Sequence, residues 1–123
     1  MIRIKHFLEP VEPSDGKRMW VEPIGLTKDL QEWCAVTHLL NSLGPPVVVW
    51  RWFQDHPDGY EYFRGKYHEF LTGDTRRKAL THLASAALHE DFTLLHQGDD
   101  PEHNTATALY EYLTELQTYV QPE

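Results

Sequence analysis

Histidine side chains can bind metals and transfer protons, and eight of the 123 residues in this chain are histidine. Two metal ligands on one helix face lie three or four residues apart, and no two of these histidines have that spacing. His82 and His89 are seven residues apart, which is too far for one ion without further ligands. His96 and His103 could converge beside three acids, Asp99, Asp100 and Glu102. We nevertheless expect surface or structural histidines, no metal site and no cofactor.

Acid–base chemistry is the second possibility, since a histidine titrates near neutral pH and a carboxylate can serve as its partner. Glu22 lies in a predicted strand at 17–24, and His96 ends another at 92–96. His103 stands in the first turn of the last predicted helix, followed by Asn104. We expect these four side chains around one cleft, where Asn104 either hydrogen-bonds a ligand or braces the loop.

Two arginines lie among aromatic residues. Arg51 is part of the run Trp-Arg-Trp-Phe at 50–53, and Arg64 lies near Tyr67 and two further tyrosines, Tyr60 and Tyr62. Such a cluster can form a ligand pocket, with Arg51, Arg64 and Tyr67 as its binding residues. It can also be a core whose arginines extend to the solvent at its rim, which is the commoner arrangement.

The single cysteine, Cys34, excludes an intrachain disulfide and a cysteine-based zinc site. The apolar spacing from Thr27 to Leu43 predicts one helix with Thr27 as its N-cap and Cys34 on its buried side. His38 would then lie one turn from Cys34, within reach of a thiol–imidazole contact. An inert buried thiol is the favoured interpretation.

Charge and hydropathy exclude several classes of protein. Nineteen acids against eleven bases give a formal net charge of −8, and 76–78 is the only basic run. A nucleic-acid or anionic-membrane surface requires a clustered positive field, so we expect neither partner. No apolar run approaches the roughly 20 residues that span a bilayer, and the N-terminus is too polar for a signal peptide. We therefore expect a cytoplasmic protein.

The elements that position these residues alternate between two periodicities. Period-2 patterns predict strands at 2–6 and 17–24, the second with Met19 and Val21 on one face and Trp20 on the other. Helices are predicted at 27–43, 59–71, 74–88 and 101–120, and 47–53 fits either a strand or a short helix. The short apolar segment 92–96, between helices, is typical of a buried parallel strand. We therefore predict a small layered α/β domain over residues 1–123, with a largely parallel sheet and four to five flanking helices.

The strand, turn and helix start from Phe92 to Thr105 form the candidate site on topological grounds. Ligands of open α/β sheets bind outside the carboxyl ends of the strands, beside helix N-termini. Such a terminus usually favours an anion, but the carboxylates of Asp99, Asp100 and Glu102 would repel phosphate there. The glycine pattern of a dinucleotide site is also missing. Nucleotide binding is therefore disfavoured, and Asp100 is expected to cap the last helix.

Several motifs, in order along nearly the whole chain, resemble the short YeaO-like branch of domain-of-unknown-function family 488 (DUF488). They are Ile2-x-Ile4-Lys5, Asp15-Gly16-x-Arg18, Trp52-Phe53-x-x-His56-Pro57, Phe63-Arg64, Tyr67-His68-Glu69, Phe92-Thr93-Leu94-Leu95 and His103-Asn104-x-Ala106-x-x-Leu109. The resemblance implies a small α/β sandwich and favours a short helix at 46–53. It implies no reaction.

One segment departs from that family. Relatives typically carry Val-Asp-Arg-x-Trp-Pro-Arg-Gly after the second strand, whereas this chain has Val-Glu-Pro-Ile-Gly-Leu at 21–26. The acid is retained as Glu22, but both arginines and the tryptophan are absent. If those arginines bind an anion in relatives, this chain has lost that capacity or changed its ligand.

Three hypotheses about function follow. The first is an α/β domain that binds a small molecule or partner protein at the strand carboxyl ends. The alternative is a small acid–base enzyme, a hydrolase or transferase, that uses histidine and glutamate. The third is an interaction protein, such as a homodimer, that associates through exposed aromatic residues, of which Trp20, Trp50 and Tyr119 are candidates.

Overall fold

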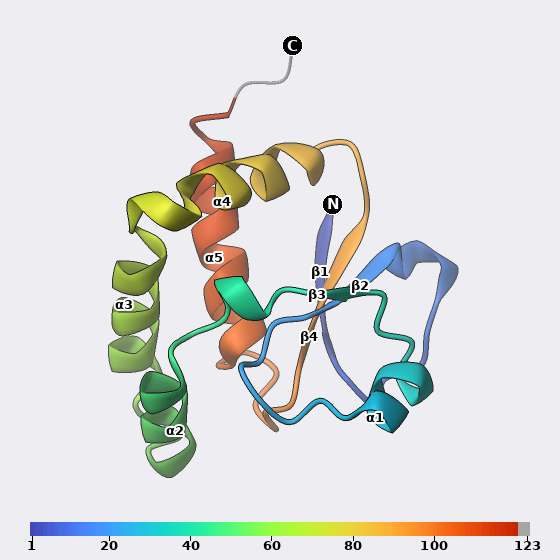
Figure 1. The fold of residues 1–123 in the computed structure, drawn as a ribbon, viewed down its shortest axis with the longest axis horizontal. Helices are drawn as coiled ribbons and strands as arrows, with labels where there is room; N and C mark the ends of the chain where they lie inside the picture. The colour runs from blue at the N-terminus through green and yellow to red at the C-terminus, as the bar shows by residue number, and fades with distance from the viewer. Residues whose placement is uncertain (121–123) are drawn as a thin grey trace.

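The computed structural model describes residues 1–120, apart from the side chain of residue 41, and shows one parallel sheet with five α-helices (Figure 1). The strands, in the spatial order β1-β4-β2-β3, are β1 (Ile2–His6), β4 (Phe92–His96), β2 (Lys17–Trp20) and β3 (His38–Leu39). The helices are α1 (Lys28–Trp33), α2 (Val47–Asp55), α3 (Tyr60–Leu71), α4 (Asp74–Ala86) and α5 (Thr105–Gln117). The predicted α/β class and parallel sheet are confirmed.

β4 is the central strand. It pairs in parallel with β1 on one side and with β2 on the other, and all five of its residues are buried. This confirms the buried parallel strand predicted at 92–96. Because the strands run in one direction, the carboxyl ends of β1, β2 and β4 meet at the same edge of the sheet.

One face of the sheet carries the main apolar core. Met19 and Val21 belong to it, together with Phe92 and Leu94 of β4. The four helices α2 to α5 lie together on this side of the sheet (Figure 1) and supply the rest of the core. At the contact of α2 with α3, the rings of Phe53 and Phe63 stack with centroids 4.3 Å apart.

The opposite face is covered by α1 and by the loop between β1 and β2. Trp20 and Leu95 point to this side and pack with Cys34 and Val36 in a second, smaller cluster. The predicted division of β2, with Met19 and Val21 on one face and Trp20 on the other, is therefore confirmed.

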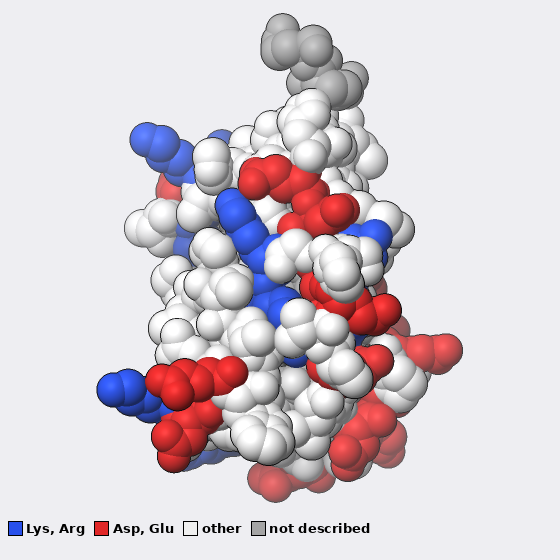
Figure 2. Space-filling model, turned by 90° about the vertical axis from the view of Figure 1, so that its right-hand side faces the viewer, with Lys and Arg blue, Asp and Glu red and all other residues white. Residues whose placement is uncertain are grey.

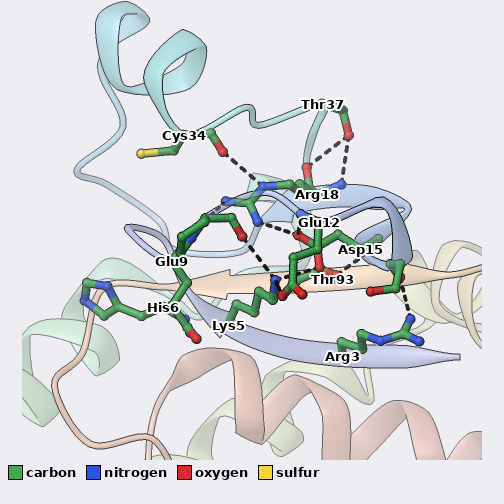
Figure 3. A network of polar contacts seen from close by, with 12 residues as sticks. Arg3, Lys5, His6, Glu9, Glu12, Asp15, Arg18, Cys34, Thr37 and Thr93 are labelled. Carbon is green, nitrogen blue, oxygen red and sulfur yellow. Dashed lines mark hydrogen bonds and ion pairs between the residues drawn. The ribbon is translucent and has the colours of Figure 1, made fainter.

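Beside this small cluster, charged side chains take the place of apolar packing (Figure 3). Asp15 and Arg18 are each 1% exposed, and Arg18 Nη1 lies 2.8 Å from Asp15 Oδ2. Lys5 Nζ lies 2.8 Å from Asp15 Oδ1, and Arg18 Nε donates to the Cys34 carbonyl at 3.0 Å. Thr93 of β4 donates to the Asp15 carbonyl at 2.8 Å. These contacts fix the loop to three strands, so that it forms part of the second layer.

Gly16 explains how the loop turns into β2. Its φ of +61° lies in the left-handed region, which favours glycine. A Cβ at this position would come 2.0 Å from the Asp91 carbonyl oxygen. The chain therefore requires glycine here, both for its backbone conformation and for the close approach of the segment before β4.

The single helix predicted from Thr27 to Leu43 is wrong. Thr27 is an N-cap, as predicted, since its hydroxyl accepts from Leu30 N at 3.1 Å. However, α1 ends at Trp33, Ala35 adopts a positive φ of 52°, and the chain then forms β3 along the edge of β2. Pairing with β2 outweighs the helical spacing, and Trp33 is left 82% exposed.

The structure resolves one open alternative of the sequence prediction and corrects two predicted boundaries. Residues 47–53 are helical, within α2, as the family resemblance implies. β2 ends at Trp20, so the strand predicted at 17–24 is too long. The last helix begins at Thr105 with Asn104 as its N-cap, so the prediction of Asp100 as the cap is wrong.

Figure 2 shows the face that carries α1 and the loop between β1 and β2, where acidic and basic side chains are interspersed without a broad basic patch. Within residues 1–120, none of the helices has both the length and the apolar character needed to cross a bilayer.

Candidate functional site

A cleft of about 420 Å³ lies at the carboxyl ends of β2 and β4. One wall comes from α2 and the turn after it, and the other comes from the turn between β4 and α5. The lining residues are Glu22, Trp50, Phe53, Gln54, Pro57, Gln97, Gly98, Asp99, Asp100, His103, Asn104 and Thr105. The cleft thus occupies the edge of the sheet at which the sequence predicts a site.

Glu22 links the walls of this cleft. Its side chain is buried, and its Oε2 accepts from Trp50 Nε1 at 2.6 Å and from Thr105 Oγ1 at 2.9 Å. Its Oε1 accepts from Gln97 N at 3.1 Å. One carboxylate therefore connects α2, the end of β4 and the first turn of α5 to the segment that follows β2.

The charge of Glu22 has no cationic partner in the cleft, because none of the described lining residues is a lysine or an arginine. Burial raises the pKa of the Glu22 carboxyl, since the charged form is poorly solvated there. The hydrogen bonds from Gln97, Thr105 and Trp50 act in the opposite direction and lower the pKa, but burial prevails.

His103 and Asp100 stand at the rim of the cleft. The His103 Nδ1 lies 2.9 Å from Asp100 Oδ2, and the His103 ring contacts that of Tyr60 at 4.9 Å between centroids. The hydrogen bond that His103 donates to the Asp100 carboxylate raises the pKa of His103. Hydrogen bonds from the Glu102 backbone and from His103 lower the pKa of Asp100. His103 therefore shares the cleft with Glu22, as the acid–base hypothesis requires.

Asn104 is almost fully buried and braces the turn. Its Oδ1 accepts from Thr107 N at 2.8 Å, and its Nδ2 donates to the Asp100 carbonyl at 2.9 Å. The first bond satisfies a backbone N–H that the helix itself leaves without a partner. The amide thus holds the turn that carries Asp99 and Asp100.

His96 is buried and does not line the cleft. Its Nδ1 lies 3.1 Å from the Gly98 carbonyl oxygen, and its ring meets that of His6 edge to face with centroids 5.5 Å apart. Burial, and next the neighbouring His6, lower the pKa of His96. The structure therefore separates His96 from the Glu22–His103 side of the site.

The three remaining candidates, Arg51, Arg64 and Tyr67, also lie outside the lining of the cleft. Arg51 is exposed on α2, while Arg64 pairs with Glu111 and so joins α3 to α5. Tyr67 is completely buried and donates its hydroxyl to the Leu43 carbonyl at 2.5 Å. In this structure Arg64 and Tyr67 hold helices and loops together.

Sequence reasoning missed the partners of Glu22, namely Trp50, Gln97 and Thr105. Gln97 directly follows β4, so the rule that sites lie at strand carboxyl ends could have indicated it. The Trp50 indole N–H needs an acceptor when it is half-buried. Because 47–53 could be either a strand or a helix, the sequence did not show on which side of the segment the Trp50 side chain lies.

Among the residues that the structure describes, neither Cys34 nor the histidines form an alternative site. Burial raises the pKa of the Cys34 thiol, which favours the unreactive protonated form. His38 lies exposed on β3 with its Nδ1 2.8 Å from Thr37 Oγ1, and the helix that would pair it with Cys34 is absent. Within residues 1–120, no three histidine, cysteine, aspartate or glutamate side chains are grouped so that they could hold a metal ion.

Comparison with known proteins gives a family and distant relatives. Residues 1–121 match the family model described as the inactive DUF488-N3 subclade. The uncharacterised proteins Rv3073c of Mycobacterium tuberculosis and Mb3100c of Mycobacterium bovis are each 28% identical over 76 residues. These matches cover 57% of this chain, and the chain spans about 59% of the length of these relatives. No solved structure matches. The chain therefore belongs to the DUF488 family, within the DUF488-N3 subclade described as inactive.

Proposed function

We propose that this chain is a non-catalytic binding domain whose small-molecule ligand occupies the cleft at the carboxyl ends of β2 and β4. The observation that carries this proposal is the position of Glu22, a buried carboxylate in the cleft lining that is held by three protein donors. Clefts of roughly 300–1,000 Å³ with a few fixed polar groups are typical small-molecule sites.

The same hydrogen bonds argue against a catalytic role for Glu22. A general base must have a free lone pair directed at the proton that it removes. Glu22 Oε2 already accepts two hydrogen bonds and Oε1 accepts a third, so a single acceptor position remains, enough to bind a ligand group but not to bind a substrate and also remove its proton. The description of the subclade as inactive supports the same interpretation.

An acid–base hydrolase or transferase is the second candidate, because Glu22 and His103 line one cleft. His103 is about half exposed and is paired with Asp100, so the imidazole is accessible to a substrate. Steady turnover of a generic ester or phosphodiester that disappears in His103→Ala would favour this candidate over the binding domain.

NMR mapping tests the proposal. A library of cationic, neutral and anionic fragments is titrated into ¹⁵N-labelled protein, and backbone amide shifts are recorded. We expect saturable shifts at Gln97, Gly98 and Thr105, with no turnover of the fragments. Fragments that shift only residues remote from the cleft, or that shift none, would refute the proposal.

A further inference from the structure

We propose that the cleft selects a cationic ligand, an ammonium or guanidinium group attached to a small apolar body, and that Glu22 is its charge partner. This inference rests on the proposed binding function and adds the chemical class of the ligand.

The first observation is the charge of the lining. The described lining residues include three carboxylates, Glu22, Asp99 and Asp100, and no lysine or arginine. His103 is the only lining residue that could carry a positive charge, and it is already paired with Asp100. The electrostatic potential in the cleft is therefore negative, which favours a cation over an anion.

The second observation is the state of the Glu22 carboxylate. A carboxylate offers about four acceptor positions, and the protein fills three of them, two on Oε2 and one on Oε1. All three donors are neutral, and Glu22 is only 2% exposed. A buried charge without a counter-ion is costly, so a ligand cation at the remaining Oε1 position would be stabilised.

The third observation is the apolar part of the wall. Trp50, Phe53 and Pro57 line the side of the cleft that α2 and the following turn provide. An indole face attracts a cation, and all three side chains can cover the hydrocarbon part of a ligand. The cleft thus combines a carboxylate with an apolar surface, which suits an amine that carries an aromatic or aliphatic body.

The same geometry disfavours an anion. The N-terminus of α5 would ordinarily attract one, but Asn104 already accepts from Thr107 N there. The hydroxyl of Thr105 is likewise directed to Glu22. These donors are therefore not available to an anion, and the carboxylates of the lining repel it. We expect the cleft to bind anions weakly.

Calorimetry with three matched probes tests the inference. Phenethylamine hydrochloride, 2-phenylethanol and sodium phenylacetate share a phenyl body and differ in charge. Each is titrated into the parent protein and into Glu22→Gln, Asp99→Asn and Glu69→Gln, after thermal melts have shown that each variant is folded. Glu69 is exposed on α3 and does not line the cleft, so its variant removes one negative charge elsewhere.

We expect phenethylamine to bind the parent and Glu69→Gln equally, and to bind Glu22→Gln about tenfold more weakly, the loss expected for one charge-assisted hydrogen bond. Asp99→Asn should weaken binding severalfold, which keeps the test valid if Glu22→Gln does not fold. Binding of all three probes with equal affinity would overturn the cation preference and leave the binding function intact. Failure of every probe and of the NMR library to bind the cleft would overturn both.

Discussion

Trp50 Nε1 lies 2.6 Å from Glu22 Oε2, so a single hydrogen bond joins α2 to the segment that follows β2. The same oxygen accepts from Thr105 at the start of α5. The cleft is therefore built on one carboxylate that two helices share, and its shape depends on both helices remaining bonded to Glu22.

The first prediction concerns the indole donor. Trp50→Phe keeps the aromatic ring but removes the N–H, so the buried carboxylate loses one of its three donors. We expect a loss of about 1–3 kcal/mol in the free energy of unfolding, measured by urea denaturation at neutral pH. Trp33, which is 82% exposed, provides the control, and Trp33→Phe should change stability by less than about 0.5 kcal/mol. An equally small change in the free energy of unfolding for both variants would show that the Glu22–Trp50 hydrogen bond does not contribute to stability.

The second prediction concerns the pH dependence caused by Glu22. Because burial raises its pKa above the ordinary value of 4.5, the folded state holds the proton to a higher pH than the unfolded state does. The contribution of Glu22 to stability is therefore largest at low pH and declines as the pH rises from about 4.5 through the folded-state pKa. Glu22→Gln lacks this decline, so its stability relative to the parent should improve as the pH rises. Parallel curves of unfolding free energy between pH 4 and pH 8 would contradict the raised pKa.

The third prediction concerns the buried ion pair on the other face of the sheet (Figure 3). Burial raises the pKa of Asp15, but hydrogen bonds from Lys5, the Glu12 backbone and Arg18 outweigh it and lower the pKa below 3.8. Asp15→Asn leaves Arg18 buried without its partner, so we expect a loss of about 3–5 kcal/mol near neutral pH.

The stability that Asp15 contributes is present above its unfolded-state pKa and is lost as the pH falls through its lower folded-state value. The difference between Asp15→Asn and the parent should therefore narrow below about pH 3.8. As a control, Glu12→Gln removes an acid whose side chain is 62% exposed and should cost less than about 1 kcal/mol. A cost as small for Asp15→Asn would contradict the structural role of the pair.

The fourth prediction distinguishes the two possible caps of α5. Asn104→Ala removes the side chain that accepts from Thr107 N and should reduce stability by about 0.5–2 kcal/mol. Asn104→Asp retains the acceptor and should recover most of that loss. Asp100→Ala should have the smaller effect, because Asp100 is exposed and does not cap the helix. A larger loss of stability in Asp100→Ala than in Asn104→Ala, measured by chemical denaturation, would instead identify Asp100 as the cap.

Much of the sheet could be predicted because its signals are local. An apolar five-residue segment between helices identifies β4, and alternation within β2 separates Met19 from Trp20. Given parallel strands, their carboxyl ends must share one edge, which brings Glu22 and the turn before α5 to one cleft. These inferences need only periodicity and topology.

Other features depend on contacts that no local pattern encodes. β3 forms because the edge of β2 offers backbone hydrogen-bonding partners to His38 and Leu39. The apolar residues of that segment nevertheless have helical spacing, so the sequence predicted a helix there. The direction of Trp50 depends on whether 47–53 is helical, which the residues alone leave open. The buried pair of Asp15 and Arg18 lies in a segment that reads as an ordinary polar loop.

The indole resonance of Trp50 offers the most direct test of the claim that the cleft is a binding site. The four tryptophans should give separate indole N–H peaks, and loss of one peak in Trp50→Phe identifies that of Trp50. During titration with phenethylamine hydrochloride, we predict that this peak shifts saturably while that of the exposed Trp33 stays in place. Binding that leaves the Trp50 peak unmoved, or that moves the Trp33 peak instead, would contradict the account.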